Sequence, residues 1–389
     1  MVPLFILAHL AHHLTTALPT PLLPFIRDEF ALDYTRSGLL MSAFSLSYGF
    51  SQLPAGWLAD RAGSRFLLTL SIVGVGVAAL IIGLSYTYLL LIIGLVLMGI
   101  AGGGYHPTSP TVISAVVEPR RRGWALGLHM MGGSISFFLT PLIAAGIAAA
   151  WSWRGTFITM ALPSIIFGVF FYTVLKRRVP EIKRERTTKN AADQEPSVPG
   201  RMRRLITLIV LSTVTQSAIV SVISFIPLYF VDHYGISKEA AAASISLIYG
   251  TGLFGGPLGG YLSDRFGRLS VILTVCLLGA PAVYLLTVTP AGIAMWALLV
   301  GVGLVMYINT SASQAFVVDH TTTSNRSTML GIYFFGTMEG AGVFTPVIGN
   351  LIDRFSFATT FSVTAGIMLT STLICALLLR SGKKPREAL

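Results

Sequence analysis

The sequence predicts an all-α polytopic membrane protein, and three observations support this fold class. Of the 389 residues, 53% are hydrophobic and only 11% are charged, whereas about a quarter of the residues in a soluble domain are charged. Apolar runs recur along the whole chain, and each has roughly the 20 residues that a helix needs to span a bilayer. The runs are continuous rather than alternating, which is typical of membrane helices and not of an outer-membrane barrel.

Six apolar runs precede a polar central segment and six follow it. The predicted spans are 2–26, 36–58, 66–84, 87–116, 123–147, 153–175, 204–231, 237–261, 269–288, 290–317, 327–350 and 356–379. The first run is too long for the apolar part of a signal peptide and lacks a preceding basic segment, so it is interpreted as a membrane helix. The predicted domains are a first six-helix bundle at 1–175, a linker at 176–203, and a second bundle with a short basic tail at 204–389.

Basic residues are distributed unevenly between the two sides of the predicted membrane. An even number of helices puts both termini and the linker on one side, and 22 of the 27 Lys and Arg residues fall there. The other five are Arg27, Arg36, Arg154, Lys238 and Arg354. The positive-inside rule therefore places both termini in the cytoplasm and the chain in a cell (inner) membrane. We attribute the net charge of +11 to this topology and to anionic lipid, and not to nucleic acid.

A short charged turn occurs twice, at equivalent places in the two halves. The first copy is GWLADRAGSR at 56–65, and the second is GYLSDRFGR at 260–268, which lies 204 residues later. Leu126-Gly127 and Leu330-Gly331 repeat at the same offset. These repeats predict two six-helix halves that run in the same direction and are related by an axis along the membrane normal. A solute site is expected between them at the membrane midplane.

On these residues the chain resembles the major facilitator superfamily of transporters over essentially its whole length. The resemblance implies the superfamily fold of twelve helices in two six-helix bundles. It also implies that the charged turns form a latch, which holds the two halves together in the outward-facing state. The latch residues implied in this way are Gly56, Asp60, Arg61, Gly63, Arg65, Asp264, Arg265 and Arg268.

Further residues are similar to the fosmidomycin-resistance type of efflux protein. They are the glycine-rich fourth span ending at 104–107 (GYHP), Ala8-His9 in the first span, and the segment 28–32. Two positions depart from the pattern of the superfamily's drug antiporters. Leu95 stands where many of them carry an arginine, and Thr140-Pro141 stands in place of Gly-Pro. These departures weaken an assignment to the antiporters.

Ionisable groups inside membrane spans are costly, so each one is a candidate for function. Fifteen of the sixteen acidic residues fall in turns, tails or the linker, counting Glu239 at the very start of its span, and Glu339 is the exception. Glycines at 336, 340 and 342 allow its helix to approach a neighbour closely. We expect Glu339 to exchange a proton or bind the solute. The alternative is a structural hydrogen bond inside the bundle.

Histidines supply the other main candidates. His9 and His13 share a face of the first span, which Thr16 and Thr20 extend, and His12 lies beside it. Because histidine titrates near physiological pH, this polar stripe suits proton exchange or an acidic solute, although packing alone would also explain His9. No further ligands stand at metal-binding spacing, so we expect no metal site and no cofactor besides the coupling proton.

His106 lies where two prolines interrupt the fourth span. Pro107 and Pro110 should disturb backbone hydrogen bonds and free carbonyl groups that then need polar partners. A histidine at such a break is well placed to touch a solute, but a purely structural kink would also account for the prolines. The weaker candidates are His129 in the fifth span and, in the second half, Gln216, Asn309 and Gln314.

Together these observations predict a proton-coupled secondary transporter that exports a small organic compound, which could be an anion or a drug. The alternative function is uptake or facilitated transport of an organic acid. Nucleotide-binding, zinc-protease and serine-hydrolase motifs are absent from the sequence, so we expect neither ATP hydrolysis nor enzyme activity. The expected partners are a small solute and the lipid bilayer, and the chain is expected to act as a monomer without nucleic acid.

Overall fold

The computed structural model describes residues 1–179, 200–321 and 326–380, and every regular element in these ranges is a helix. The centre of the predicted linker and most of the basic tail lie outside the described residues. The first half contains α1 (Val2–Thr16), α2 (Pro19–Phe30), α3 (Tyr34–Ala62), α4 (Ser64–Gly83), α5 (Tyr88–Gly102), α6 (Tyr105–Val116), η1 (Pro119–Arg121), α7 (Arg122–Ala150) and α8 (Trp153–Arg178).

The second half repeats this arrangement of long helices joined by short turns. It contains α9 (Arg201–Tyr234), α10 (Lys238–Gly250), α11 (Gly252–Phe266), α12 (Arg268–Leu285), α13 (Ile293–Asp319), α14 (Arg326–Phe334), the π-helical turn η2 (Phe335–Glu339), α15 (Gly340–Arg354) and α16 (Phe357–Arg380).

Each of the twelve predicted spans coincides with one helix or with two or three consecutive ones. Ten of these units are long and apolar enough to cross a membrane by length and composition. The other two are α3 and the α14–η2–α15 unit. Because the ranges that the structure describes contain helices and no strand, the prediction of an all-α polytopic protein is confirmed.

Proline and glycine break some of the spans. Pro19 begins α2 after α1 has ended, since proline lacks the N–H donor that an uninterrupted helix would use. Gly103 and Gly104 separate α5 from α6 one turn before Pro107, where the sequence predicts a break. The first and fourth spans are therefore each built from two helices, which lets the second helix take a new direction.

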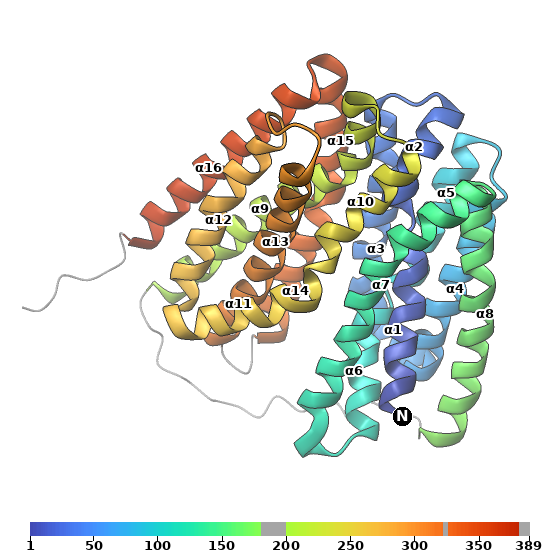
Figure 1. Cartoon of the computed structure of the whole chain (residues 1–389). Helices are drawn as coiled ribbons and strands as arrows, with labels where there is room; N and C mark the ends of the chain where they lie inside the picture. The colour runs from blue at the N-terminus through green and yellow to red at the C-terminus, as the bar shows by residue number, and fades with distance from the viewer. Residues whose placement is uncertain (180–199, 322–325, 381–389) are drawn as a thin grey trace, which may run out of the picture.

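The helices form two groups that meet along one interface (Figure 1). In the first group α4 packs on α5 and α8, and α1 packs on α7; in the second, α12 packs on α13 and α16, and α9 packs on α15. The broadest contacts between the groups are those of α3 with α15 and of α7 with α10. These helices belong to the second and fifth spans of each half. The interface is therefore built twice from equivalent spans, as parallel repeats require.

Small residues let α3 and α15 lie close together. A Cβ atom added at Gly38 of α3 would lie 2.8 Å from the carbonyl oxygen of Thr345 and 2.9 Å from Cα of Pro346. Nearby, the Ser42 hydroxyl donates a hydrogen bond across the interface to the carbonyl oxygen of Gly342. The atoms that a larger side chain would meet belong to the backbone, which cannot move aside as easily as a flexible side chain.

Gly38→Ala is therefore expected to destabilise the packed protein by about 1–3 kcal/mol, the usual effect of overpacking. The measurement is the melting temperature of the detergent-purified protein, which should fall. Gly146→Ala in α7 is the matched control, because nothing lies within 4 Å of its added Cβ. Equal melting temperatures for both variants and the wild type would contradict this account of the α3–α15 contact.

Candidate functional site

Five of the chain's seven histidines lie together in the first half, and we call them the histidine cluster. The ring centroid of His9 is 4.3 Å from that of His129, 4.8 Å from that of His13 and 5.4 Å from that of His106. The fifth ring, of His12, is 4.8 Å from His13. Helix α1 contributes three of these residues, whereas α6 and α7 contribute one each. Side chains that the sequence presents as separate candidates thus form one group.

Close helix approach and the break in the fourth span bring these rings together. A Cβ atom added at Gly133 of α7 would lie 2.7 Å from Cε1 of His9, so the glycine allows α7 to approach α1. After the break, α6 begins at Tyr105, whose fully buried ring stacks on His12 with a centroid distance of 4.4 Å. The next residue, His106, then lies edge-on to His9.

Backbone carbonyl groups fix the tautomers of His9 and His129. The Nδ1 of His9 lies 2.8 Å from the carbonyl oxygen of His129, and the Nδ1 of His129 lies 3.0 Å from that of Phe5. A carbonyl oxygen only accepts, so Nδ1 carries the proton and Nε2 of each neutral ring has a lone pair. The Nε2 of His9 is buried and has no hydrogen-bond partner among the described residues. It is therefore open to a proton, a cation or a donor from a solute.

His12 differs from its neighbours because both of its ring nitrogens are occupied. Nδ1 donates to the carbonyl oxygen of Ser71 at 3.2 Å, and Nε2 accepts from the hydroxyl of Tyr48 at 3.2 Å. The ring is completely buried. This geometry joins α1 to α3 and α4, and it favours a positioning role for His12 over direct contact with a solute.

His13 lies on the side of the cluster that faces the second half. Its Nδ1 lies 3.1 Å from the hydroxyl of Thr16, which already donates to the carbonyl oxygen of His12 and so accepts from His13. The His13 ring packs 4.6 Å from Phe137, which in turn packs 5.4 Å from Tyr249 of α10. Only one aromatic ring thus separates the cluster from the second half.

Glu339 ends the π-helical turn η2, and its side chain crosses from the second half to the first. It lies against Gly49 of α3, where a Cβ atom would overlap it, and its Oε1 accepts from the Gln52 amide at 3.3 Å. The residue is 3% exposed, and Oε2 has no hydrogen-bond partner among the described residues. Since Tyr48, the partner of His12, precedes Gly49, Glu339 and the cluster contact consecutive residues of α3.

The remaining candidates lie in the second half, away from the cluster. Asn309 is buried, and its side-chain oxygen accepts from the Ser313 hydroxyl at 3.2 Å and the Cys276 thiol at 3.6 Å, which joins α13 to α12. Gln216 in α9 has a buried Oε1 without a partner among the described residues. Gln314 is half-buried on α13. Asn309 therefore has the contacts of a residue that holds helices together.

The two charged turns have the same backbone form. Gly63 and Gly267, which are 204 positions apart, have φ angles of 90° and 86°, in the region that favours glycine. Arg65 donates to the carbonyl oxygen of Val179, the residue that follows α8, at 2.8 Å, and the Arg61 guanidinium lies 4.0 Å above the Trp57 ring. The Arg65 bond joins α4 to the end of α8, and the Arg61 contact lies within α3, so both stay in the first half.

The second charged turn also bonds within its own half. Arg268 pairs with Asp264 and, at 3.1 Å, with Asp319, while Arg265 donates to the Tyr261 hydroxyl at 3.0 Å. Gly56 and the side chain of Asp60 in the first turn lie outside what the structure describes. A latch between the halves therefore stays a prediction.

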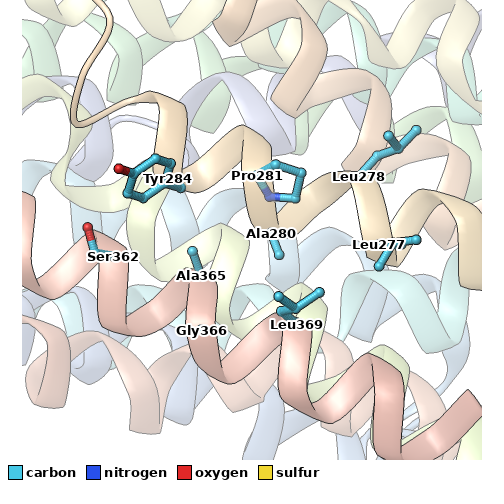
Figure 2. Close-up of a pocket in the computed structure, with 9 residues that line it drawn as sticks. All are labelled: Leu277, Leu278, Ala280, Pro281, Tyr284, Ser362, Ala365, Gly366 and Leu369. Carbon is cyan, nitrogen blue, oxygen red and sulfur yellow. The ribbon is translucent and has the colours of Figure 1, made fainter.

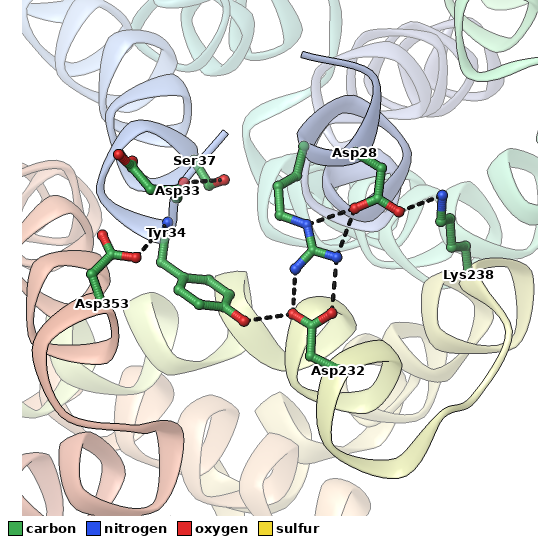
Figure 3. A network of polar contacts seen from close by, with 8 residues as sticks. Asp28, Asp33, Tyr34, Ser37, Asp232, Lys238 and Asp353 are labelled. Carbon is green, nitrogen blue, oxygen red and sulfur yellow. Dashed lines mark hydrogen bonds and ion pairs between the residues drawn. The ribbon is translucent and has the colours of Figure 1, made fainter. Parts of the chain in front are cut away.

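A polar network that was not predicted from the sequence lies at the opposite end of the molecule from these turns (Figures 1 and 3). The Arg27 guanidinium forms a two-pronged ion pair with Asp232 of α9, and the Tyr34 hydroxyl donates to the same carboxylate at 2.7 Å. Beside it, Asp28 pairs with Lys238 of α10 at 2.5 Å. We call these five residues, together with Thr35 and Asp353, the gate network.

Asp353 completes the gate network by binding the N-terminus of α3. Its carboxylate oxygens accept from the backbone N–H groups of Tyr34 at 2.9 Å and Thr35 at 2.8 Å, where the helix dipole favours a negative charge. Both of these bonds join the first half to the second. The contacts of Asp232 with Arg27 and Tyr34, and of Lys238 with Asp28, do the same. The two halves are therefore held together at this end.

An apolar groove lies between α12 and α16, and none of the residues that line it belongs to the histidine cluster or is Glu339 (Figure 2). Its lining includes Leu277, Leu278 and Leu369, which are between 38% and 55% exposed. Exposed leucines on two membrane helices suit contact with lipid chains. The groove offers little to orient a polar solute.

Two groups of membrane helices that meet along a polar boundary are the arrangement expected of a secondary transporter. The profile of the Major Facilitator Superfamily matches residues 5–335 and 250–389 of the chain. Because the matches cover nearly the whole sequence, the chain belongs to this superfamily of transporters.

The chain is similar to transporters that are named for different kinds of solute. The hexuronate transporter of Bacillus subtilis (strain 168) is 24% identical over 376 residues, which cover 90% of this chain and 87% of that protein. Multidrug resistance protein MdtG of Klebsiella pneumoniae (strain 342) is 26% identical over 358 residues, with 88% and 84% covered. Both relatives are matched over most of their length.

A solved structure shares the fold at lower identity. It is the crystal structure of a bacterial homologue of the human lysosomal transporter Spinster in an inward-facing and occupied conformation. The TM-score is 0.81 at 16% identity, over 98% of this chain and 95% of that one.

Asp232→Ala is expected to open the gate network, because it removes the acceptor of both Arg27 and Tyr34. Losing hydrogen bonds to a charged group should shift the equilibrium toward separation at this end by about 1–3 kcal/mol, which is about 5- to 150-fold. Spin labels at Leu89 and Phe355, which are both well exposed, report this change as a longer distance in pulsed electron resonance.

Glu239→Ala provides the control for this experiment. Glu239 lies in the first turn of α10, close in sequence to Asp232, and the described residues show no ion pair for it. An unchanged distance distribution in Asp232→Ala would show that the gate network does not hold the halves together.

Proposed function

We propose that this protein is a proton-coupled secondary transporter that exports a small organic compound by rocking its two halves about the polar boundary. In this proposal, the termini and the linker lie in the cytoplasm, and the chain works as a monomer in the cell (inner) membrane. The proton is the coupling ion, and no other cofactor takes part. The chain carries out no enzymatic reaction.

The observation that carries the proposal is the position of Glu339. It is the only acidic residue that is buried in the described part of the chain, and it lies on one half while contacting the other. A neutral carboxyl group tolerates such an interface, but an ionised one needs water or a partner charge. Protonation of Glu339 should therefore favour the packed arrangement described here, and deprotonation should favour an arrangement that hydrates it.

The histidine cluster can serve as one binding site for both the proton and the solute. Neighbouring rings in the cluster lie 4.3–6.2 Å apart by their centroids, so two neighbouring charged imidazolium groups would repel each other strongly. A bound anion would relieve that repulsion. The cluster can thus link protonation to the binding of an acidic solute, while His12, through Tyr48, connects it to the helix that Glu339 touches.

The gate network supports the proposed alternating access. With the linker in the cytoplasm, the network closes the outer end of the molecule, and the structure corresponds to an inward-facing or occluded state. Export requires that the gate network breaks while contacts form at the charged turns. The latch role of those turns, implied by the superfamily resemblance, fits this exchange of contacts.

Glu339→Gln tests the proton-coupling role directly. The variant keeps the size of the side chain and one acceptor oxygen, replaces the other oxygen with an NH2 donor and cannot ionise, so pH-driven transport in proteoliposomes should fall at least tenfold. Glucuronate and ethidium serve as the solutes, and an internal pH dye reports the proton flux. Glu118→Gln, at an exposed position before η1, is the matched control. Undiminished coupling in Glu339→Gln would rule out this role.

Uptake of an organic acid is the second candidate function, and the histidine cluster is the observation that favours it. An anion and a proton that stabilise each other at one site would move in the same direction. Measuring solute movement under proton gradients of opposite sign distinguishes uptake from export. Glucuronate accumulation with an inward proton gradient would indicate uptake, whereas ethidium expulsion driven by that gradient would indicate export.

A further inference from the structure

Three histidines of the cluster have the arrangement of metal ligands. One nitrogen from each of His9, His13 and His106 lies within 4.8 Å of the other two, and no other group of this kind was found in the described part of the chain. The ligands come from α1 and α6, and 93 residues separate the last two in the sequence. This distance explains why no metal-binding spacing is visible in the sequence.

On α1, the Nε2 atoms of His9 and His13 are unprotonated, which is the form that binds a metal ion. A metal ion binds the lone pair of a neutral imidazole, whose other nitrogen usually donates to a carbonyl group or another oxygen. In His9 that bond runs from Nδ1 to the carbonyl oxygen of His129, and in His13 from Nδ1 to the hydroxyl of Thr16. Both bonds leave Nε2 unprotonated and fix the plane of each ring.

The unpaired nitrogen of His9 is a second observation that points to a ligand. His9 is only 1% exposed, yet its Nε2 has no hydrogen-bond partner among the described residues. A buried polar atom without a partner is costly, and native proteins usually satisfy it with an ion, a water molecule or a ligand. The ring of His9 already packs against those of His13 and His106, so an ion placed there would reach all three.

The chemistry of the three ligands selects the class of ion. Imidazole nitrogen suits Zn²⁺, Co²⁺, Ni²⁺ and Cu²⁺, whereas Mg²⁺ and Ca²⁺ prefer oxygen ligands. Tetrahedral zinc with bonds of about 2.0–2.1 Å brings its nitrogen ligands to about 3.4 Å from each other. The separations here are at most 4.8 Å, so side-chain movement of roughly 1 Å or a little more closes the site.

We propose that His9, His13 and His106 bind one divalent transition-metal ion of the zinc class. His106 is the one half-buried residue of the three, so water or an anion would complete the coordination from its side. An anionic fourth ligand would also offset the positive charge of the ion inside the membrane. This site goes beyond the proposed function, because proton coupling through Glu339 requires no metal. In the histidine cluster the ion and the protons compete for the same nitrogens.

Zn²⁺ and Co²⁺ binding to the purified full chain tests the site. The protein carries no polyhistidine tag and is stripped with a chelator; calorimetry then measures Zn²⁺ binding, and visible absorption follows the coordination of Co²⁺. We expect one ion per chain, with affinity that falls as the pH is lowered because protons compete for the same nitrogens. His106→Asn and His13→Asn should each weaken binding at least tenfold.

His233→Asn and His320→Asn are the matched controls, because these two histidines lie outside the cluster and should leave binding unchanged. The melting temperature of every variant shows whether it is folded. If His13→Asn unfolds, His106→Asn at the half-buried position decides the outcome. Absence of a stoichiometric site in the wild type, or equal binding by the cluster variants and the controls, would overturn the proposal.

Discussion

The structure depends on one constraint: polar groups inside the bilayer must find their partners within the protein. Helices satisfy the backbone, but buried polar side chains still need neighbours from other helices. His9 and His129 do so by bonding to backbone carbonyl groups of neighbouring helices, and Glu339 by bonding to Gln52 of the other half. The polar side chains therefore lie where helices meet, and this requirement positions the site.

Helix α3 connects the parts of this protein that have a proposed role. It has 29 residues and is thus about 43 Å long. Its first residues bind Asp353 and Asp232 in the gate network, its middle holds Tyr48 beside the histidine cluster and Gly49 beside Glu339, and its last turn carries Arg61. A tilt of this one helix against α15 would change the gate network, the carboxyl site and the charged turn together. This is the mechanical basis for the proposed link between protonation and access.

The sequence was a good guide to elements that depend on local composition. Apolar runs predicted the position of every span, because a helix that crosses hydrocarbon must be predominantly apolar. The prolines near His106 predicted the break between α5 and α6, and the repeated turn predicted equivalent glycines at Gly63 and Gly267, which share a positive φ. The gate network was missed because charges at several short turns reveal neither which turns become neighbours nor which ions pair.

The sequence by itself determined an all-α membrane protein with two repeated halves, and it identified the histidines and Glu339 as candidates. The length of an apolar run, the spacing of its polar residues and the cost of burying an ionisable group all depend on one helix at a time. The sequence alone therefore indicates them. Only the tertiary structure decided that His9, His13 and His106 converge, that Glu339 crosses to Gly49, and which nitrogens remain available. Those results depend on how separate helices approach one another, which glycines such as Gly133 permit but do not specify.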